Sequence, residues 1–384
     1  MAGRYRIVSA DSHLDANPDH WTPHVPARWR DRAPRRIRLE DGEDAVVMEG
    51  VPMSKIGMTV STGVPRDQWH TRVMTFDNSA GCAGPDQRIK EQDVDGVDAE
   101  VIFNFVQIRH WRGIKEDDGY AALIHAWNEW LAEDYCSNAP DRLLAMASIP
   151  PTNIDHAVAE LEYAARVGFK GVCLYAFPNG KITPKPEDDR FWAAALDHGI
   201  AITSHAGGTS SRFGPPDHPD LRSSPIEASP AGARTFFRFC GDMAYAPMQL
   251  AFAGVFDRFP NLQILWAETN IGWLPYALDQ IDDNYERYRI LNTETMGIPP
   301  LQRKPSEYLC DNNLWSFMND RYGVQHRDPR TIDKIMWSSD FPHSATDWPN
   351  SLETIDEVME GVPADDRYKM VAGNAIKFFH LNDG

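Results

Sequence analysis

Eight short runs rich in β-branched and other apolar residues recur along this chain, and amphipathic stretches separate most of them. The predicted strands are residues 7–13, 99–105, 143–150, 171–176, 201–207, 262–268, 313–318 and 334–340. The predicted helices are residues 117–136, 153–167 with Asn153 as cap, 187–198, 234–259 and 271–290. Strands that alternate with helices over 384 residues predict an α/β fold, a (β/α)8 TIM barrel, with a doubly wound open sheet as the alternative.

One long stretch departs from this alternation. Residues 17–85 are rich in Pro, Arg, Gly and Asp and follow the first strand, with a hairpin expected near residues 44–52. A second irregular stretch, residues 208–232, follows the fifth strand. Loops after barrel strands lie at the end of the barrel that carries active sites. We therefore expect one domain, residues 1–384, in which the insertion at 17–85 is a lid or a dimer arm.

The composition narrows the class of partner. A formal net charge of −18 repels phosphate backbones, and no basic stripe with interleaved aromatics offsets it, which disfavours nucleic-acid binding. The sequence shows neither an apolar run of membrane-spanning length nor a charged-then-apolar leader, so we expect a cytoplasmic protein that does not bind membranes. Its five cysteines form no CxxC and are expected to be reduced. A small molecule is the expected partner.

Metal-binding residue types stand at the ends of several predicted strands. Asp11 and His13 end the first strand, His205 the fifth, Glu268 the sixth and Asp340 the eighth. A lone Asp-x-His is more often a helix cap or a hydrogen-bonded core pair. The carboxyl ends of barrel strands meet at one mouth, however, and imidazoles with carboxylates suit one divalent ion, Zn²⁺ or Mn²⁺, with room for water or substrate. The joint pattern predicts a mononuclear metal site.

Several longer segments resemble a known family. They are the Asp-x-His, "SHAGG", "FAGVFDRFPNLQILWAETNIGWLPYALDQIDD", "WSSDFPHSATDWPNS" and "MVAGNAIKFFHL". They resemble the amidohydrolase-2 family, the branch of the amidohydrolase superfamily that includes aminocarboxymuconate-semialdehyde decarboxylase and metal-dependent aromatic-acid decarboxylases. The resemblance runs from residue 5 to residue 381. It implies that one metal is bound by Asp11, His13, His205 and Asp340, and that Asp340 also handles the proton.

The sequence departs from the family pattern at two positions. Characterised decarboxylases often have His or Glu where this chain has Asp11, and a His that acts as acid or base where it has Glu268. A carboxylate at position 11 still binds a metal ion. The resemblance implies a metal-dependent carboxy-lyase, a non-oxidative decarboxylase of an aromatic or unsaturated (hydroxy)carboxylic acid. The alternative is a hydrolase of an amide, lactone or C–C bond that uses metal-bound water, and an intact ligand set disfavours a non-catalytic barrel.

Three further residues are candidates for roles in the site. Glu268 is expected to orient a ligand or relay protons, with an ion pair to an arginine as the alternative. His343, three residues after Asp340, is expected to donate a hydrogen bond to that carboxylate, or else to fix the loop. Trp266 shares a strand face with Glu268 and is expected to line an aromatic-acid pocket, unless it fills the core.

Arginines are the natural ligands of a substrate carboxylate. Arg234 is assigned to this role, and the pattern leaves three other arginines near the expected mouth open, which are Arg88, Arg109 and Arg212. The insertion suggests a homo-oligomer, most simply a homodimer. Aromatic residues of the insertion are its candidate contacts, namely Trp21, Trp29 and Trp69.

Overall fold

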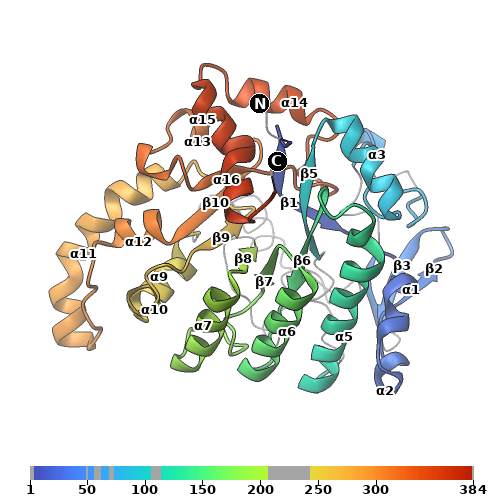
Figure 1. Ribbon diagram of the computed structural model, residues 1–384, viewed down its shortest axis with the longest axis horizontal. Helices are drawn as coiled ribbons and strands as arrows, with labels where there is room; N and C mark the ends of the chain where they lie inside the picture. The colour runs from blue at the N-terminus through green and yellow to red at the C-terminus, as the bar shows by residue number, and fades with distance from the viewer. Residues whose placement is uncertain are drawn as a thin grey trace.

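The computed structural model describes residues 4–48, 51–55, 62–68, 73–104, 114–205 and 243–382. Within these residues, eight parallel strands form one sheet in the order β1-β5-β6-β7-β8-β9-β10-β11, and helices surround it (Figure 1). The strands are β1 (Val8–Leu14), β5 (Ala99–Asn104), β6 (Leu143–Ser148), β7 (Gly171–Leu174), β8 (Ala201–His205), β9 (Ile264–Ala267), β10 (Asn313–Phe317) and β11 (Ile335–Trp337). The predicted (β/α)8 barrel is confirmed, and every strand falls within its predicted range or one residue beyond it.

Helices follow the strands, as the sequence pattern predicts. They are α3 (Pro85–Asp95), α5 (Asp117–Trp130), α6 (Ile154–Val167), α7 (Asp189–His198), α9 (Tyr245–Phe252), α10 (Val255–Arg258), α11 (Leu274–Met296), α12 (Pro305–Asp311), α13 (Arg321–Gln325), α14 (Ser351–Val358), α15 (Ala364–Tyr368) and α16 (Asn374–Phe378). The Asn153 side chain accepts a hydrogen bond from the His156 backbone at 3.0 Å, which confirms the predicted cap.

The prediction of one continuous helix over residues 234–259 is wrong in its described part. Two short helices, α9 and α10, occupy residues 245–258 instead. Gly254 separates them because its φ of 67° is left-handed, a conformation that no helical residue adopts. The helix predicted at 271–290 is longer than expected, because α11 continues to Met296 and ends at a left-handed Gly297.

The strands carry a continuous apolar core. Every residue of β5, β6 and β10 is buried, because helices cover the outer face of the barrel and side chains fill its interior. Glu100 in β5 is a charged exception within that run, with 3% of its surface exposed. A buried carboxylate requires a partner, and the partner of Glu100 lies in α3.

Contacts between β1 and the segment that follows β11 close the barrel. The His13 N–H donates to the Phe341 carbonyl at 2.6 Å, and the Asp340 N–H donates to the Asp11 carbonyl at 2.9 Å. The Ser339 N–H donates to the Ser9 hydroxyl at 2.9 Å. We call this junction of β1 with residues 339–341 the seam. The seam therefore joins the two ends of the chain that the sequence assigns to the metal site.

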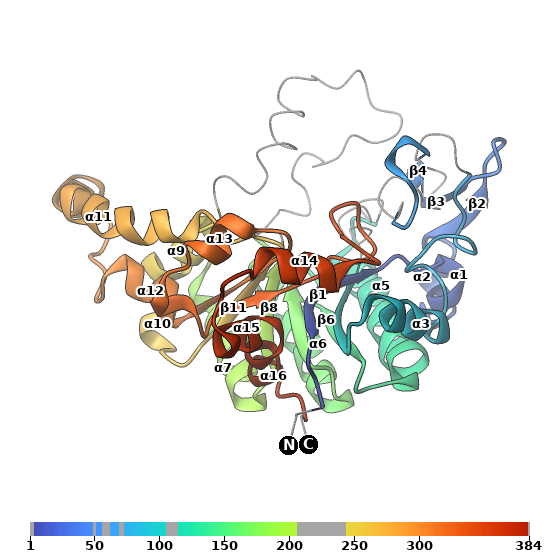
Figure 2. The same cartoon turned by 90° about the horizontal axis from the view of Figure 1, so that it is seen from above.

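The insertion after β1 contains a second, smaller sheet. Its strands are β2 (Arg35–Arg38), β3 (Asp44–Met48) and β4 (Val51–Lys55), all antiparallel, and they lie to one side of the barrel (Figure 2). The helices α1 (Pro18–Trp21) and α2 (Ala27–Arg30) precede the sheet. The predicted hairpin is confirmed as β3–β4, whereas β2 was not predicted because its Arg-rich sequence has no apolar alternation.

Residues of the insertion pack against the loop that follows Asp340. The Thr62 hydroxyl donates to the Pro342 carbonyl at 2.5 Å. Gly81 lies so close that an added Cβ atom would overlap the Pro342 ring. The expectation that Trp21 is a dimer contact is wrong, because this side chain is fully buried and packs edge-on against Trp127. Trp69 lies outside the described residues.

Two expectations drawn from composition can be checked against the described part of the chain. Among the described residues, no helix combines the length and the apolar character that crossing a membrane requires. Four of the cysteines, Cys82, Cys136, Cys173 and Cys310, are buried and free, and Cys240 lies outside the described residues. The free thiols agree with the expected reduced state.

Candidate metal centre

The structure brings four predicted ligands together at the carboxyl ends of the barrel strands. Asp11 and His13 lie in β1, His205 is the last residue of β8, and Asp340 follows β11 by three residues. All four side chains are buried, and both aspartates have no exposed surface. They meet because barrel closure places β1 beside the segment after β11, with β8 across the mouth.

The donor atoms of Asp11, His13 and His205 lie within 4.8 Å of one another, and Asp340 adjoins this group through His13, with which it forms a second group that includes His343. The two Nε2 atoms of His13 and His205 are 3.0 Å apart. Nε2 of His13 is 3.3 Å from Oδ1 of Asp11 and 3.2 Å from Oδ1 of Asp340. Nε2 of His205 is 3.3 Å from Oδ2 of Asp11. Nitrogen and oxygen ligands about 2.1 Å from one Zn²⁺ ion are separated by distances of this size.

The hydrogen bonding of the cluster also fits a cation. Neither carboxylate oxygen of Asp11 has a hydrogen-bond partner of good geometry within the described part of the chain, although imidazole nitrogens lie 3.3 Å away. Oδ2 of Asp340 and Nδ1 of His13 are likewise buried without such a partner there. Buried carboxylate oxygens are costly unless a proton, a donor or a metal ion satisfies them. The residues present therefore fit one divalent ion.

The charges within the cluster are strongly coupled. Burial alone would raise the pKa of Asp11, but the imidazoles of His205 and His13 outweigh burial and lower that pKa to about 2. Burial alone would lower the pKa of His13, but Asp11 and Asp340 raise it to about 10. The pKa of Asp340 is held well below its ordinary value by His343 and His13, against the effect of burial. Without an ion, the protonated His13 thus supplies the positive charge that the two carboxylates favour.

His343 and Glu268 contact the ligands from outside the four-residue set. Nδ1 of His343 lies 3.0 Å from Oδ1 of Asp340, and its ring stacks on that of His13 at 3.9 Å. Burial and the neighbouring charge of His13 lower the pKa of His343 to about 4. Oε2 of Glu268 lies 3.6 Å from Nδ1 of His205. Glu268 is therefore placed to orient His205 through its second ring nitrogen, whereas His343 contacts the same oxygen of Asp340 that faces His13.

The structure describes Trp266 and Arg88 among the residues considered for substrate binding, and neither is shown to face the cluster. The Trp266 indole N–H donates to the Asn313 side chain at 2.7 Å, and the Asn313 amide donates to the carbonyl of Tyr308 in α12. These contacts run towards the helix layer and favour the core-filling alternative for Trp266. Arg234, like Arg109 and Arg212, lies outside the described residues. Arg88 is described, but with 1% of its surface exposed it is not available to a substrate.

Sequence reasoning missed the residues that hold the seam together. Ser9, Ser12 and Ser339 form hydroxyl contacts of 2.9–3.1 Å with one another across it. Glu100 accepts hydrogen bonds from Ser12 at 3.3 Å and from Arg88 at 2.7 Å. The sequence did contain one indication of this network. Glu100 is a charged residue inside the apolar run of β5, and such a residue needs a buried partner.

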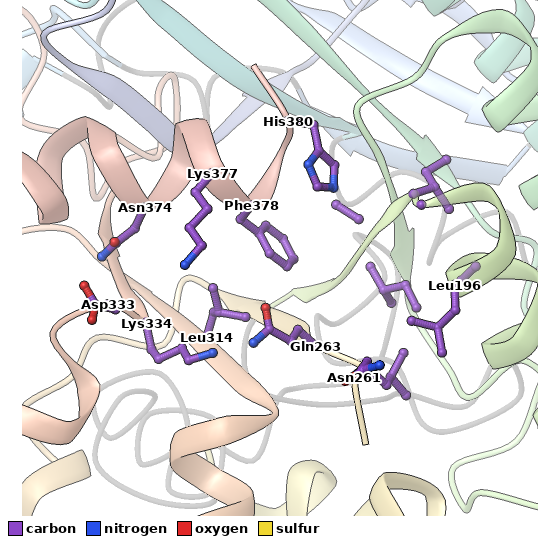
Figure 3. Close-up of a pocket in the computed structure, with 16 residues that line it drawn as sticks. Leu196, Asn261, Gln263, Leu314, Asp333, Lys334, Asn374, Lys377, Phe378 and His380 are labelled. Carbon is purple, nitrogen blue, oxygen red and sulfur yellow. The ribbon is translucent and has the colours of Figure 1, made fainter. Parts of the chain in front are cut away.

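A cavity of about 310 Å³ lies at the opposite end of the barrel (Figure 3). Ala201, which begins β8, and Lys334, which precedes β11, line this cavity, whereas the predicted ligands His205 and Asp340 stand at or beyond the other ends of these strands. Asn374 in its wall donates to the carbonyls of Ile332 and Ile335 at 2.9 and 2.8 Å, which agrees with a structural role. The cavity contains none of the predicted site residues and is distinct from the metal centre.

Known proteins resemble this chain both in sequence and in fold. The family model described as Amidohydrolase matches residues 69–381. A gamma-resorcylate decarboxylase of Rhizobium sp. is 24% identical over 317 residues, which cover 77% of this chain and 87% of the relative. An amidohydrolase structure from Mycobacterium avium subsp. paratuberculosis superposes with a TM-score of 0.74 at 18% identity, covering 98% of this chain and 99% of the other.

A second solved structure contains a metal and a ligand. It is the 5-carboxyvanillate decarboxylase of Novosphingobium aromaticivorans in complex with manganese and 4-hydroxy-3-methoxy-5-nitrobenzoic acid. It matches with a TM-score of 0.68 at 19% identity and covers 98% of this chain and 96% of the other. At these identities the two structures establish the shared barrel fold.

Proposed function

The chain belongs to the amidohydrolase family, and we propose that it is a metal-dependent carboxy-lyase, a non-oxidative decarboxylase of an aromatic or unsaturated hydroxycarboxylic acid. The observation that carries the proposal is a buried set of donor atoms at the barrel mouth. His13 lies 3.0–3.3 Å from His205, Asp11 and Asp340, and His205 lies 3.3 Å from Asp11. The decarboxylase activity named for the Rhizobium relative supports the reaction type.

The proposed cofactor is one Zn²⁺ or Mn²⁺ ion held by these four residues. When bound, the ion supplies Lewis-acid stabilisation of negative charge on substrate oxygens. The manganese in the Novosphingobium structure supports Mn²⁺, and the two imidazoles of the donor set are equally suited to Zn²⁺.

Asp340 is proposed to move the proton. Its Oδ1 faces His13 and His343, whereas its Oδ2 has no hydrogen-bond partner within the described residues. Oδ2 accepts the proton of the substrate hydroxyl and then delivers it to the ring carbon that carries the carboxylate. The bond from that carbon to the carboxylate breaks, its electron pair stays with the carbon that gains the proton, and carbon dioxide leaves. Solvent returns a proton to the product oxygen.

His343 and Glu268 are proposed to orient the ligands. His343 fixes the Asp340 carboxylate through Oδ1, which leaves Oδ2 for the proton. Glu268 lies beside Nδ1 of His205 and thereby directs Nε2 of that ring to the cluster. Arg234 remains our proposal for the residue that binds the substrate carboxylate, because an arginine fork matches a carboxylate in geometry and charge.

The test is release of carbon dioxide from ortho-hydroxybenzoates. The purified protein, loaded with Mn²⁺ or Zn²⁺, is incubated with 2,6-dihydroxybenzoate and with benzoate, which lacks the hydroxyl. We expect carbon dioxide and the decarboxylated phenol from the hydroxy acid alone. Hydrolysis of a lactone or amide panel, without carbon dioxide from any of the hydroxy and unsaturated acids supplied, would support the hydrolase alternative and overturn the proposal.

We also propose that the protein is a cytoplasmic homodimer. The end of α11 projects from the barrel and exposes apolar side chains, among them Ile290, Leu291 and Met296, which supports a protein contact (Figure 2). The contacts of Thr62 and Gly81 with the Pro342 loop support the insertion as a lid or dimer arm at the mouth. Light scattering coupled to size exclusion measures the mass, and a monomer at micromolar concentration would contradict the dimer.

A further inference from the structure

The guanidinium of Arg88 lies inside the protein, next to the metal centre. Arg88 belongs to α3, and 1% of its surface is exposed. A buried guanidinium is unfavourable unless its donors find acceptors, so its contacts indicate what it holds in place.

The contacts of Arg88 reach three separate parts of the barrel. Nε donates to Oε2 of Glu100 in β5 at 2.7 Å, and Nη1 donates to the His13 carbonyl in β1 at 2.9 Å. Nη2 lies 3.4 Å from the Phe341 carbonyl beyond β11, and the guanidinium also lies 4.5 Å from the centre of the Phe341 ring. One side chain thus connects β1, β5 and the segment after β11.

These contacts lie on both sides of the seam. Asp11 and His13 come from one side of it and Asp340 from the other, so the distances between their donor atoms depend on how β1 and residues 339–341 are aligned. Arg88 contacts the backbone of His13 and of Phe341, the residue after Asp340. The Phe341 carbonyl also accepts the His13 N–H at 2.6 Å, so both bonds act on the same alignment.

We propose that Arg88 is a positioning residue of the metal centre, which sets the spacing between Asp340 and the β1 ligands by bonding both sides of the seam. Glu100 fixes the guanidinium, since it accepts from Nε of Arg88 and from Nε2 of Gln92 at 2.9 Å. The inference rests on the metal binding of the proposed function and does not depend on which reaction follows.

Lysine cannot reproduce this arrangement. The planar guanidinium donates in several fixed directions at once, whereas an ammonium group is a compact point charge on a flexible stem. Arg88→Lys keeps the charge beside Glu100 but loses simultaneous contact with the two carbonyls. The seam then loosens while the pairing with the buried carboxylate is retained.

Arg142 offers a matched control. It also bonds two backbone carbonyls, those of Asp98 and Val97 at 3.1 and 3.3 Å, and pairs with Asp93 of α3 at 2.8 Å. These contacts lie at the amino ends of β5 and β6, away from the mouth. Arg142→Lys therefore disturbs a similar structural bridge without touching the seam.

The experiment measures Mn²⁺ binding alone, from the electron paramagnetic resonance signal of the free ion, with melting temperatures recorded in parallel. We expect Arg88→Lys to raise the dissociation constant at least tenfold, since outer partners that hydrogen-bond ligand residues typically contribute tenfold to hundredfold in metal affinity. Arg142 bonds no ligand residue, so we expect Arg142→Lys to change the constant by less than about twofold. Unchanged affinity in Arg88→Lys, or an equal loss in Arg142→Lys, would overturn the inference.

Two further outcomes separate this inference from the proposed function. If Arg88→Lys does not fold, Glu100→Gln decides instead. It keeps the arginine but weakens the acceptor that fixes its guanidinium, so we expect a several-fold weaker Mn²⁺ affinity, whereas wild-type affinity rejects the role of Arg88. Wild-type protein that binds Mn²⁺ but releases no carbon dioxide removes the proposed reaction and leaves the Arg88 inference standing. Wild-type protein that binds neither Mn²⁺ nor Zn²⁺ overturns both.

Discussion

Metal binding at the cluster that contains Asp11 and Asp340 should stabilise the folded protein. The two carboxylates have no exposed surface, and both oxygens of Asp11 lack a hydrogen bond of good geometry within the described residues. An ion present at a hundred times its dissociation constant adds about 2.7 kcal/mol to the free energy of unfolding. Unfolding entropy of roughly 0.8 kcal/mol per kelvin for a chain of this length converts that to a rise of about 3 °C in melting temperature.

The assay is a thermal melt of chelator-treated protein with and without Mn²⁺ or Zn²⁺. Asp11→Asn keeps the shape of the side chain but replaces a charged ligand by a neutral amide, so we expect the metal-dependent rise to disappear. Asp95→Asn is the matched control, since Asp95 is a buried carboxylate that accepts two hydrogen bonds from Ser351 instead. A full 3 °C rise in Asp11→Asn, or no rise in wild-type protein with either ion, would refute the reasoning.

Three other perturbations test the site. Asp340→Asn should lower kcat at least about a hundredfold, as expected for a lost proton-transfer group, and wild-type turnover in steady-state assays would reject that role. Metal affinity should rise about tenfold per pH unit from pH 6.5 to 8.5. The reason is that the ion must displace the proton of His13, whose pKa is raised to about 10 in the ion-free cluster. Affinity measured by competition with a chelator at several pH values checks this, and an affinity that does not change with pH contradicts it. Trp266→Phe should lower the free energy of unfolding in urea by about 2 kcal/mol, because it leaves the Asn313 oxygen without its donor. KM should stay unchanged, and a raised KM would instead support Trp266 as a residue of the substrate pocket.

The sequence predicted the barrel, and which residues the strand ends bring to its mouth, because both depend on local patterns. A β-rich run that ends in Asp-x-His or in a lone His shows both the strand and the residue that this strand presents at the mouth. The local pattern therefore placed Asp11, His13 and His205 at the strand ends where the structure has them.

Features that depend on distant contacts were not predictable in the same way. Arg88 was one of four open candidates for the substrate carboxylate, because nothing near it in sequence shows that Glu100 and two carbonyls would enclose it. Trp266 was placed beside Glu268 by strand alternation, but its indole found an acceptor in Asn313 on the neighbouring strand. In both cases, partners far along the chain decide the orientation of the side chain.

The backbone at the mouth shows how the barrel presents its acidic side chains. Asp340 and Glu268, each just beyond a barrel strand, have left-handed φ values of 52° and 56°, which cost roughly 1 kcal/mol or more for residues other than glycine. The Asp340 N–H bonds the Asp11 carbonyl, and the Glu268 N–H bonds the Ser316 hydroxyl at 2.8 Å, so neighbouring strands hold both residues in this conformation. The left-handed residue ends the extended backbone, and its own carboxylate then lies beside an imidazole of the cluster. Two of the four described non-glycine residues with left-handed φ, Asp340 and Glu268, thus carry carboxylates that contact the proposed ligand histidines, and the fold gives up some stability to place them there.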